Sequence, residues 1–415
     1  MKQRYDSYKP SGIDWIGDIP SHWKLPRVKQ FVKINNGSDP KTEGDIPVYG
    51  SGSCSFKTCG EFKLGPTVLL GRKGATLHIP HWIEGKYWNV DTAFDTNIIG
   101  DLNLRLFFYF SMLFNYEKYK SETTLPSMTQ TDYGDMYIPL PSLAEQEAIA
   151  AWLDEKCGEI DAAIAKVDRE IELIDELKQS EISRVVTRGL NPDAPLRPSG
   201  IDWIGDVPEH WFNTRIKFNI LRSAAGVWGD DEKGDENDIV CFRIADFDYD
   251  ERCLSTEKIT IRNIESKQLE GRYLSKGDLL IEKSGGGEST PVGRVVYCNY
   301  NGKATYTNFI HSITLSDSVD SRFFLYYFNM LYSNKINLLF FNQTTGLQNL
   351  QVSDYLGQSI CLPPLSEQQA IADYLDKKCA EIDGLKAKLN RKRETLTELR
   401  QSIISEVVTG KRKVI

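Results

Sequence analysis

Histidine and cysteine side chains are the first groups in this sequence to consider for metal binding or nucleophilic chemistry. His78 and His81 form an isolated H-x-x-H pair beside Pro80, without a third ligand nearby in the chain. The cysteines, at positions 54, 59, 157, 241, 253, 298, 361 and 379, include no C-x-x-C pair and no histidine at zinc-ligand spacing. Their spacing therefore argues against a metal site and against a disulfide framework.

Glycine-rich segments could bind phosphate groups, but none has the required spacing. The sequence contains no G-x-x-x-x-G-K-[ST] loop and no G-x-G-x-x-G between a strand and a helix. Residues 284–288 read S-G-G-G-E, which favours a surface loop. Residues 191–193 (N-P-D) lack the second proline and aromatic residue of an amino-methyltransferase motif, and no carboxylate cluster resembles a nuclease site. We find no catalytic constellation and predict that the chain is not an enzyme by itself.

Long helices are the elements that must position the remaining candidate residues, and one such helix occurs twice. Residues 141–187 and 363–409 are identical at 27 of 47 positions when aligned without a gap. Both copies begin with proline, a serine and Glu-Gln, which is typical of a helix N-terminus, and neither contains an internal proline. A match of this length indicates an internal duplication.

Apolar residues recur every seven positions in both copies of this helix. The first copy has Leu153, Ile160, Val167 and Ile174, and the second has Leu375, Ile382, Leu389, Leu396 and Ile403. A narrow apolar seam must be buried against another helix, and the other copy is the obvious partner. At a rise of ~1.5 Å per residue each helix would be roughly 65 Å long. Cys157 and Cys379 occupy equivalent positions in the two copies, which favours small buried thiols.

A second repeat stands at the start of each half of the chain. Residues 11–23 (SGIDWIGDIPSHW), here called the first arm, recur as the second arm, residues 199–211, with 11 of 13 residues identical. Glycine, proline and two tryptophans suggest an irregular segment packed against a neighbour, and we predict that His22 and His210 share that packing role. Between arm and helix, residues 24–140 and 212–362 show no extended register of identity.

These variable segments alternate short apolar runs with turns, which indicates α+β domains. Strands are predicted at residues 67–70, 88–90, 239–244, 278–281 and 293–297, and aromatic helices at 104–119 and 321–339. The predicted segments are a first domain (1–140), a first spacer helix (141–190), a second domain (191–362) and a second spacer helix (363–415). The predicted fold is therefore two α+β domains separated by two long antiparallel coiled-coil helices, in a pseudo-two-fold repeat.

Composition constrains the partners only weakly. The net charge of −8 over 415 residues includes a local excess of 12 acidic over 6 basic residues in 141–190. A nucleic-acid surface would therefore have to be a local basic patch. The first ten residues are polar and no apolar run approaches the ~20 residues that span a bilayer, so we expect a cytoplasmic protein without membrane contact.

Two motifs, each present twice in the same order, resemble the specificity (S) subunit of type I restriction-modification systems over nearly the whole chain. They are P-S-G-I-D-W-I-G-D-I-P-x-H-W at the head of each half and L-P-x-L-x-E-Q-x-A-I-A-x-x-L-D at Leu140–Asp154 and Leu362–Asp376. The resemblance implies a non-catalytic subunit for defence against foreign DNA. Each variable region would be a target recognition domain for one half of a split double-stranded DNA site, and the helices would form the spacer between them.

The resemblance also implies partners and cofactors. Two modification (methyltransferase) subunits would bind the assembly and hold S-adenosylmethionine for adenine methylation. Restriction (endonuclease and translocase) subunits would use ATP and Mg²⁺ for cleavage, and no cofactor would bind to this chain. Four acidic residues of the first helix are expected to face the modification subunit, although a solvated helix face is an equal alternative: Asp154, Glu155, Glu159 and Asp161.

Candidate DNA contacts lie in four polar loops of the variable regions. The first is the glycine-flanked basic loop 70–76, with Arg72, Lys73 and Thr76, and the second is the corresponding segment 281–285, with Lys283 and Ser284. Lysine and arginine suit phosphate contacts, and arginine can also pair with guanine. The other two loops supply Thr123, Thr124, Gln343, Thr345, Gln348 and Asn349, because asparagine and glutamine can pair with adenine. For each residue, an ordinary loop role is the alternative.

A coiled-coil scaffold whose variable domains bind proteins is the alternative function from another class. Salt-dependent DNA protection by the assembled complex would distinguish the two, since contacts with phosphate groups release counterions. An enzyme acting alone is a third possibility, which methylation or cleavage by the purified chain would support.

Overall fold

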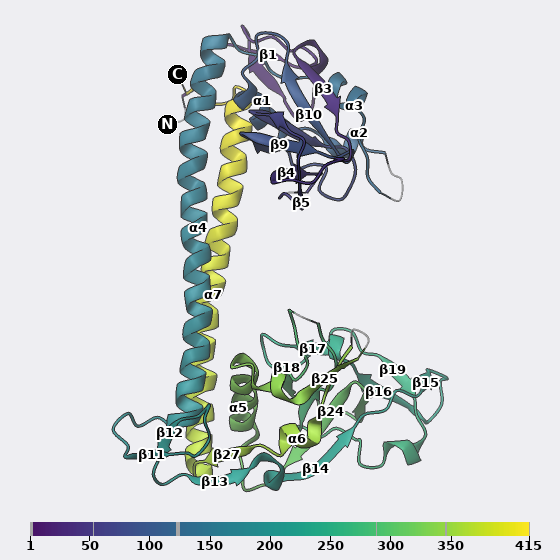
Figure 1. Cartoon of the computed structure of the whole chain (residues 1–415), viewed down its shortest axis with the longest axis vertical. Coiled ribbons are helices and arrows are strands. Elements are labelled where there is room, and N and C mark those ends of the chain that lie inside the picture. The colour runs from purple at the N-terminus through teal and green to yellow at the C-terminus, as the bar shows by residue number, and fades with distance from the viewer. Residues whose placement is uncertain (1–2, 53, 122–124, 288, 345–346, 415) are drawn as a thin grey trace. The chain divides into compact units, whose positions relative to one another are not determined.

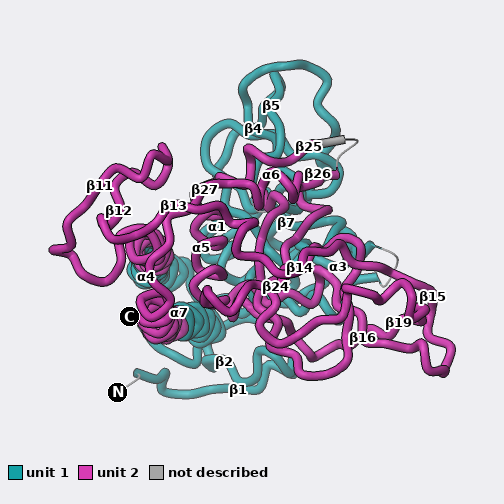
Figure 2. The backbone as a smooth tube through the Cα atoms, turned by 90° about the horizontal axis from the view of Figure 1, so that it is seen from below, with its two compact units in different colours: residues 1–169, 390–415 teal, residues 170–389 magenta. Residues whose placement is uncertain are grey.

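The computed structural model describes all residues except 1–2, 53, 122–124, 288, 345–346 and 415. The chain divides into two compact units (Figure 2). Unit 1 comprises residues 1–169 and 390–415, and unit 2 comprises residues 170–389. Each unit contains one arm, one α+β region and a part of both long helices, so we describe each unit by itself.

The two long helices are α4 (Leu143–Arg188, 46 residues) and α7 (Leu365–Val408, 44 residues; Figure 1). The prediction of a long helix after residue 141 is confirmed, and α7 begins within two residues of its predicted start. Leu153 and Cys157 are buried in the core of unit 1, and Leu375 and Cys379 in that of unit 2. The seam is less buried at Ile174, Leu389 and Leu396, which are half-buried.

Ion pairs join α4 to α7 within each unit. In unit 1, Asp161 pairs with Arg400 (2.8 Å) and Asp168 with Arg393 (2.6 Å). In unit 2, Asp175 pairs with Lys386 (2.8 Å) and Lys178 with Asp383 (2.6 Å). Within both units the residue number rises along α4 while it falls along α7, so the helix segments run antiparallel.

The described residues of unit 1 form two four-stranded sheets and three short helices, besides the long helices and the arm. The first sheet has the order β3 (Val32–Asn36), β10 (Ala93–Ile98), β7 (Thr67–Gly71), β8 (His81–Ile83), with antiparallel neighbours. The second has the order β5 (Lys57–Cys59), β4 (Ile46–Tyr49), β9 (Lys86–Asn89), β6 (Lys63–Leu64), and β4 runs parallel to β9. The helices are α1 (Leu104–Ser111), α2 (Tyr116–Tyr119) and α3 (Gln130–Asp135). In the first arm β1 (Tyr8–Pro10) pairs with β2 (Asp18–Pro20).

Unit 2 repeats these sheets with additional strands. Its largest sheet has the order β14 (Ile220–Ala225), β24 (Ile310–Leu315), β20 (Leu279–Glu282), β22 (Val295–Tyr297), β18 (Cys253–Leu254), β17 (Phe247–Asp248). The next has β15 (Asp230–Asp231), β19 (Ile261–Asn263), β16 (Asp238–Phe242) and β23 (Ala304–Tyr306). A three-stranded sheet joins β21 (Ser284–Gly285), β26 (Leu347–Leu350) and β25 (Phe341–Thr344). Two pairs complete the unit: β11 (Leu196–Pro198) with β12 (Asp206–Pro208), and β13 (Phe212–Arg215) with β27 (Ser359–Leu362).

The two α+β regions share one topology, although their sequences showed no common register. The order β3-β10-β7-β8 corresponds to β14-β24-β20-β22, and the parallel pair β4·β9 corresponds to β16·β23. A glycine follows the first strand in both regions, since a Cβ on Gly37 would lie 2.1 Å from the carbonyl oxygen of Val90, and one on Gly226 would lie 2.2 Å from that of Thr307. The two regions therefore share this close backbone approach without extended sequence identity.

Both predicted aromatic helices are shorter than expected, and local capping explains where they end. The prediction for 104–119 is wrong at its centre, because α1 ends at Ser111 and α2 starts after Asn115, whose side chain accepts from Lys118 N. In unit 2, α5 (Ser321–Ser333) ends before Lys335, which has φ +60°, and a 3-10 helix (Ile336–Phe340) follows. Each predicted strand overlaps an observed one, with ends that differ by up to two residues.

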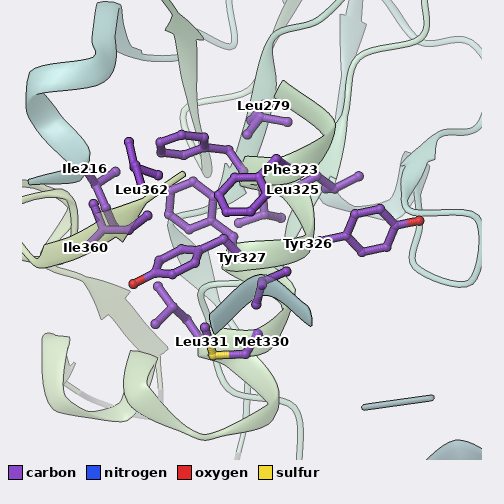
Figure 3. Close-up of a cluster of buried hydrophobic side chains, with 14 of the residues drawn as sticks. Ile216, Leu279, Phe323, Leu325, Tyr326, Tyr327, Met330, Leu331, Ile360 and Leu362 are labelled. Atoms are coloured by element: carbon purple, nitrogen blue, oxygen red, sulfur yellow. The ribbon is translucent and has the colours of Figure 1, made fainter. Parts of the chain in front are cut away.

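Aromatic helix α5 provides much of the core of unit 2. Phe323, Tyr327 and Leu331 of α5 are buried, as expected for a helix that is apolar on several faces. Figure 3 shows these side chains together with Ile216 of another 3-10 helix (Ile216–Asn219) and with Leu279, Ile360 and Leu362 of neighbouring strands. In unit 1, α1 has the same role, with Phe107 and Phe110 fully buried.

Candidate nucleic-acid interface

The basic segment of unit 1 lies at the end of β7. The N–H groups of Arg72 and Lys73 both donate to the carbonyl oxygen of Thr92, at 2.8 and 3.3 Å. Gly74 follows with φ +119°, a backbone conformation that residues with a Cβ rarely adopt. The Arg72 guanidinium donates to the Asp91 carbonyl oxygen at 3.1 Å, and Lys73 Nζ lies 3.8 Å from the Asp91 carboxylate. Both cations are therefore held beside the loop that precedes β10.

Unit 2 has the equivalent segment at the end of β20. The N–H groups of Lys283 and Ser284 both donate to the carbonyl oxygen of Phe309, at 2.8 and 3.1 Å, and Gly285 has φ +125°. Among the described residues, the Lys283 ammonium has no hydrogen bond or ion pair. Burial, and then the charge of Lys283, lower the pKa of His311 on β24 to about 4, so this imidazole is neutral near pH 7. Lys283 is therefore a cation that remains available to an anionic partner.

The other two candidate loops lie beside these basic segments. Met128 N donates to the Arg72 carbonyl oxygen in unit 1, and Leu350 N donates to that of Lys283 in unit 2. Met128 and Leu350 thus occupy equivalent positions in the two folds. Of the residues predicted there, Gln343 lies on β25, and three others lie outside the described part of the chain: Thr123, Thr124 and Thr345.

Some predicted DNA contacts already have internal partners. The Gln348 side chain is buried (3% exposed); its Oε1 accepts from Val292 N at 3.1 Å and its Nε2 donates to the Gly287 carbonyl oxygen at 3.4 Å. Asn349 is exposed and accepts from Ser284 Oγ at 2.7 Å. In unit 1 the Thr76 hydroxyl donates to the Ser51 carbonyl oxygen at 2.8 Å. Gln348 and Thr76 therefore position their loops, and contact with a base would require them to leave these partners.

The duplicated Glu-Gln pair joins each arm and each aromatic helix to the start of a long helix. In unit 1, Glu145 lies 3.0 Å from His22 Nε2 and accepts from Trp23 Nε1 at 3.4 Å, while Ser142 donates to it in a capping box. Burial raises the pKa of Glu145, but the hydrogen bonds from His22, Ser142 and Trp23 outweigh this effect and hold the pKa below its usual range. Gln146 is buried and accepts from Asn103 N at 2.7 Å, directly before α1.

Unit 2 repeats these contacts at the start of α7. Glu367 lies 2.8 Å from His210 Nε2 and accepts from Trp211 Nε1 at 3.2 Å, and Gln368 accepts from Asp320 N at 2.9 Å. The buried Trp23 and Trp211 confirm that the arms are packed. The two histidines contribute to this packing through contacts with glutamate, although their side chains are 55% and 52% exposed.

The acidic residues predicted to bind a partner subunit have basic neighbours within unit 1. Asp154 accepts from Arg105 Nε at 2.6 Å and from Tyr109 OH at 2.7 Å. Its duplicate Asp376 accepts from Arg322 and from Tyr326 OH in the same way, so this aspartate links each long helix to an aromatic helix. Lys156 pairs with Glu155 and Glu159, which are exposed, and Arg400 pairs with Asp161. Sequence reasoning missed this structural role, although the duplication of Asp154 was the available signal.

The remaining reactive groups are dispersed. Among the described residues, no three or more histidine, cysteine, aspartate or glutamate side chains gather in a way that could hold a metal ion. Burial lowers the pKa of His81, while His78 is exposed. The cysteines are free thiols. Within the described part of the chain, no helix has both the length and the apolar character that crossing a membrane requires.

Comparisons with a protein family and with individual proteins all identify type I restriction specificity proteins as similar to this chain. The family described as type I restriction modification DNA specificity domain matches residues 20–172 and 230–392. The StySPI specificity subunit of Salmonella potsdam, a type I restriction enzyme subunit, is 26% identical over 275 residues, which cover 66% of this chain and 57% of that protein. The MjaVIII specificity subunit of Methanocaldococcus jannaschii is 24% identical over 399 residues, which cover 93% of this chain and 83% of that protein. The chain thus spans little more than half of the Salmonella subunit.

A solved structure also has the same fold. It comes from work on complex assembly and conformational transition of the type I R-M system, and it is 16% identical in sequence. The TM-score is 0.67, over 94% of this chain and 98% of that chain. At this level of identity the likeness concerns the fold, and the side chains at the candidate interface have to be interpreted on their own geometry.

Proposed function

Because the chain belongs to the type I restriction-modification DNA specificity family, we propose that it reads a bipartite, asymmetric DNA site for partner subunits that methylate adenine and cleave DNA. Members of this family are specificity subunits, so the chain recognises DNA sequence and is not itself the catalytic subunit. Residues 1–140 and 191–362 would be the two target recognition domains, and residues 141–190 and 363–415 would be the spacer helices.

One observation carries this proposal: the same α+β topology occurs twice in one chain with different side chains at equivalent loops. The carbonyl oxygens of Thr92 and Phe309 accept equivalent pairs of N–H groups, yet Arg72 and Lys73 follow the strand in one region and Lys283 and Ser284 in the other. A common scaffold with different exposed side chains suits two different half-sites. Lysine and arginine at these loops suit phosphate and guanine contacts.

The long helices support a spacer role. Helices of 46 and 44 residues at a rise of ~1.5 Å per residue are roughly 65 to 70 Å long. This length is about two turns of B-DNA, at ~34–36 Å each. The ion pairs between α4 and α7 favour an antiparallel coiled coil, which would be the spacer between the two recognition domains.

The proposed partners follow from the family. Two modification subunits would bind the duplicated frame and supply S-adenosylmethionine, and restriction subunits would supply ATP-driven cleavage with Mg²⁺. We place this complex in the cytoplasm. The exposed Glu155 and Glu159 remain the better candidates for a partner contact, because they pair only locally with Lys156 on the same helix, whereas Arg105 and Arg400 link Asp154 and Asp161 to other helices.

Exchange of a variable region tests the function. Residues 24–140 would be replaced by the equivalent segment of a relative, and methylated bases would be mapped in cells that contain the complete system. We expect one half of the methylated sequence to change while the other half stays. Exchange of residues 212–362 is the matched control and should change only the other half. If neither exchange alters the sequence, the proposed function is refuted.

A further inference from the structure

The loop whose carbonyl oxygen accepts the N–H groups of the basic segment carries different side chains in each unit. In unit 2 it consists of Asn308 and Phe309, directly before β24, and in unit 1 the equivalent residues are Asp91 and Thr92, directly before β10. The equivalence rests on the paired hydrogen bonds to the Phe309 and Thr92 carbonyl oxygens. These two loops are therefore the same corner of one scaffold with different side chains.

The unit 2 corner combines an exposed amide with an apolar cavity. Asn308 is exposed, and its side chain has no hydrogen bond to any other described residue. The Phe309 ring is 44% exposed, although large apolar residues are usually buried. Phe309, Trp228 and Ile244 line a cavity of about 470 Å³ at this corner. An amide and an apolar surface thus lie side by side, next to Lys283.

The other cations near this cavity have carboxylate partners. Arg243 pairs with Asp246 at 2.9 Å. Arg262 lies over the Trp228 ring, 4.2 Å from its centroid, and pairs with Asp231. Within the part of the chain that the structure describes, the cavity is therefore an apolar surface beside the Asn308 amide and the Lys283 ammonium, which has no ion-pair partner, and not a general anion site.

A T·A base pair presents the complementary chemistry in the major groove. Thymine offers its 5-methyl group, and adenine offers an N7 acceptor beside an N6 donor that an asparagine amide can pair with. Building on the proposed function, we propose that Asn308 and Phe309 determine specificity for a T·A pair in the half-site read by unit 2. Asn308 pairs with the adenine, Phe309 contacts the thymine methyl group, and Lys283 binds a nearby phosphate.

The corner of unit 1 lacks this combination. Asp91 offers a carboxylate, which can accept from the N4 group of cytosine, and Thr92 replaces the aromatic ring. Arg72, held at the same corner, can pair with the guanine of the same base pair. The preference for a thymine methyl group should therefore belong to unit 2 alone.

The first test uses variants in the complete system. Asn308→Ala, Phe309→Ala and the control Asn301→Ala, another exposed amide in unit 2, would be compared by mapping methylated bases. We expect discrimination at one T·A position to fall roughly tenfold to a hundredfold in Asn308→Ala, and roughly fourfold in Phe309→Ala, which removes only the contact with one methyl group. Asn301→Ala should methylate the same DNA sequence as the wild-type protein. Circular dichroism would check the fold of each variant.

The second test measures DNA binding and does not require a variant to support methylation. Duplexes with deoxyuridine in place of thymidine at that position lack only the methyl group, and the assembled wild-type complex should bind them roughly fourfold more weakly. Phe309→Ala should bind both duplexes equally.

Three results would overturn the inference: a unit 2 half-site without a T·A pair, an unchanged sequence in both variants, or equal wild-type binding to both duplexes. Failure of the proposed function looks different, because then exchange of either variable region would leave the methylated sequence unaltered.

Discussion

Replacement of one buried amide should uncouple α1 from α4. The Gln146 side chain accepts from Asn103 N at 2.7 Å and donates to the carbonyl oxygens of Asp101 and Pro141, both at 3.1 Å. Gln146 is 1% exposed, so these three bonds lie in or at the edge of the core of unit 1. Gln146→Leu keeps the approximate volume of the side chain but removes all three bonds.

The expected loss of stability follows from the hydrogen-bonding groups that Gln146→Leu leaves without a partner. A buried donor or acceptor without a partner costs ~1–3 kcal/mol, and a net hydrogen bond contributes ~0.5–1.5 kcal/mol. The Pro141 carbonyl oxygen is buried, so the loss of its partner has the full free-energy cost. Asn103 N and the Asp101 carbonyl oxygen are only partly buried, so water can replace part of their lost hydrogen bonds. We therefore expect a loss of about 3 kcal/mol in the free energy of opening, which is roughly a hundredfold fall in amide protection.

Hydrogen exchange measured by mass spectrometry resolves this effect in peptides that cover residues 101–111. The control is Gln401→Leu, an exposed glutamine on α7 in the same unit. We expect the loss of protection in Gln146→Leu and nearly unchanged exchange in Gln401→Leu. If both variants change protection by less than about threefold, Gln146 does not hold α1 to the long helix and the reasoning fails.

Three further predictions concern unit 2. Lys283→Ala should weaken binding to all DNA sequences about equally and lower the slope of log K against log salt by about 1, as measured by titration of the assembled complex; an unchanged slope would exclude a phosphate contact. Burial lowers the pKa of His311 to about 4 in the folded protein, below the ordinary value of 6.5, so the unfolded state binds the proton more readily. The contribution of His311 to the free energy of unfolding is therefore fully present above pH 6.5 and falls, by at most ~3 kcal/mol, as the pH drops towards 4. The variant His311→Phe should lack this part of the pH dependence when unfolding by urea is measured. Gly226→Ala should destabilise by about 2 kcal/mol through backbone clashes, while Gly384→Ala, in an open helical position, should stabilise by about 0.5–1 kcal/mol, and thermal unfolding would show whether the two signs differ.

The sequence by itself determined the features that depend on local or repeated patterns. The duplicated segments predicted the starts of α4 and α7, because an apolar period of seven and a helix cap are properties of neighbouring residues. The two motif pairs identified the family. The correspondence between Arg72 and Lys283 was also visible, since both follow a predicted strand and stand two residues before a glycine.

Only the tertiary structure decided which side chains are available. Gln348 resembled a base contact in the sequence, but Val292 N and the Gly287 carbonyl oxygen occupy its amide. Asp154 resembled a free acidic residue, but Arg105 and Tyr109, more than forty positions earlier, bind it. Hydrogen-bond partners distant in the chain leave no periodic pattern.

The common topology of the two variable regions also required the structure. Strand order and close backbone approaches, such as that of Gly226 to Thr307, can be kept while most side chains change. For the same reason the corner formed by Asn308 and Phe309 became visible only when β24, β20 and their connecting loops were placed together. Local periodicity fixed the long helices of this chain, and contacts between distant segments fixed the surface that meets DNA in the proposed function.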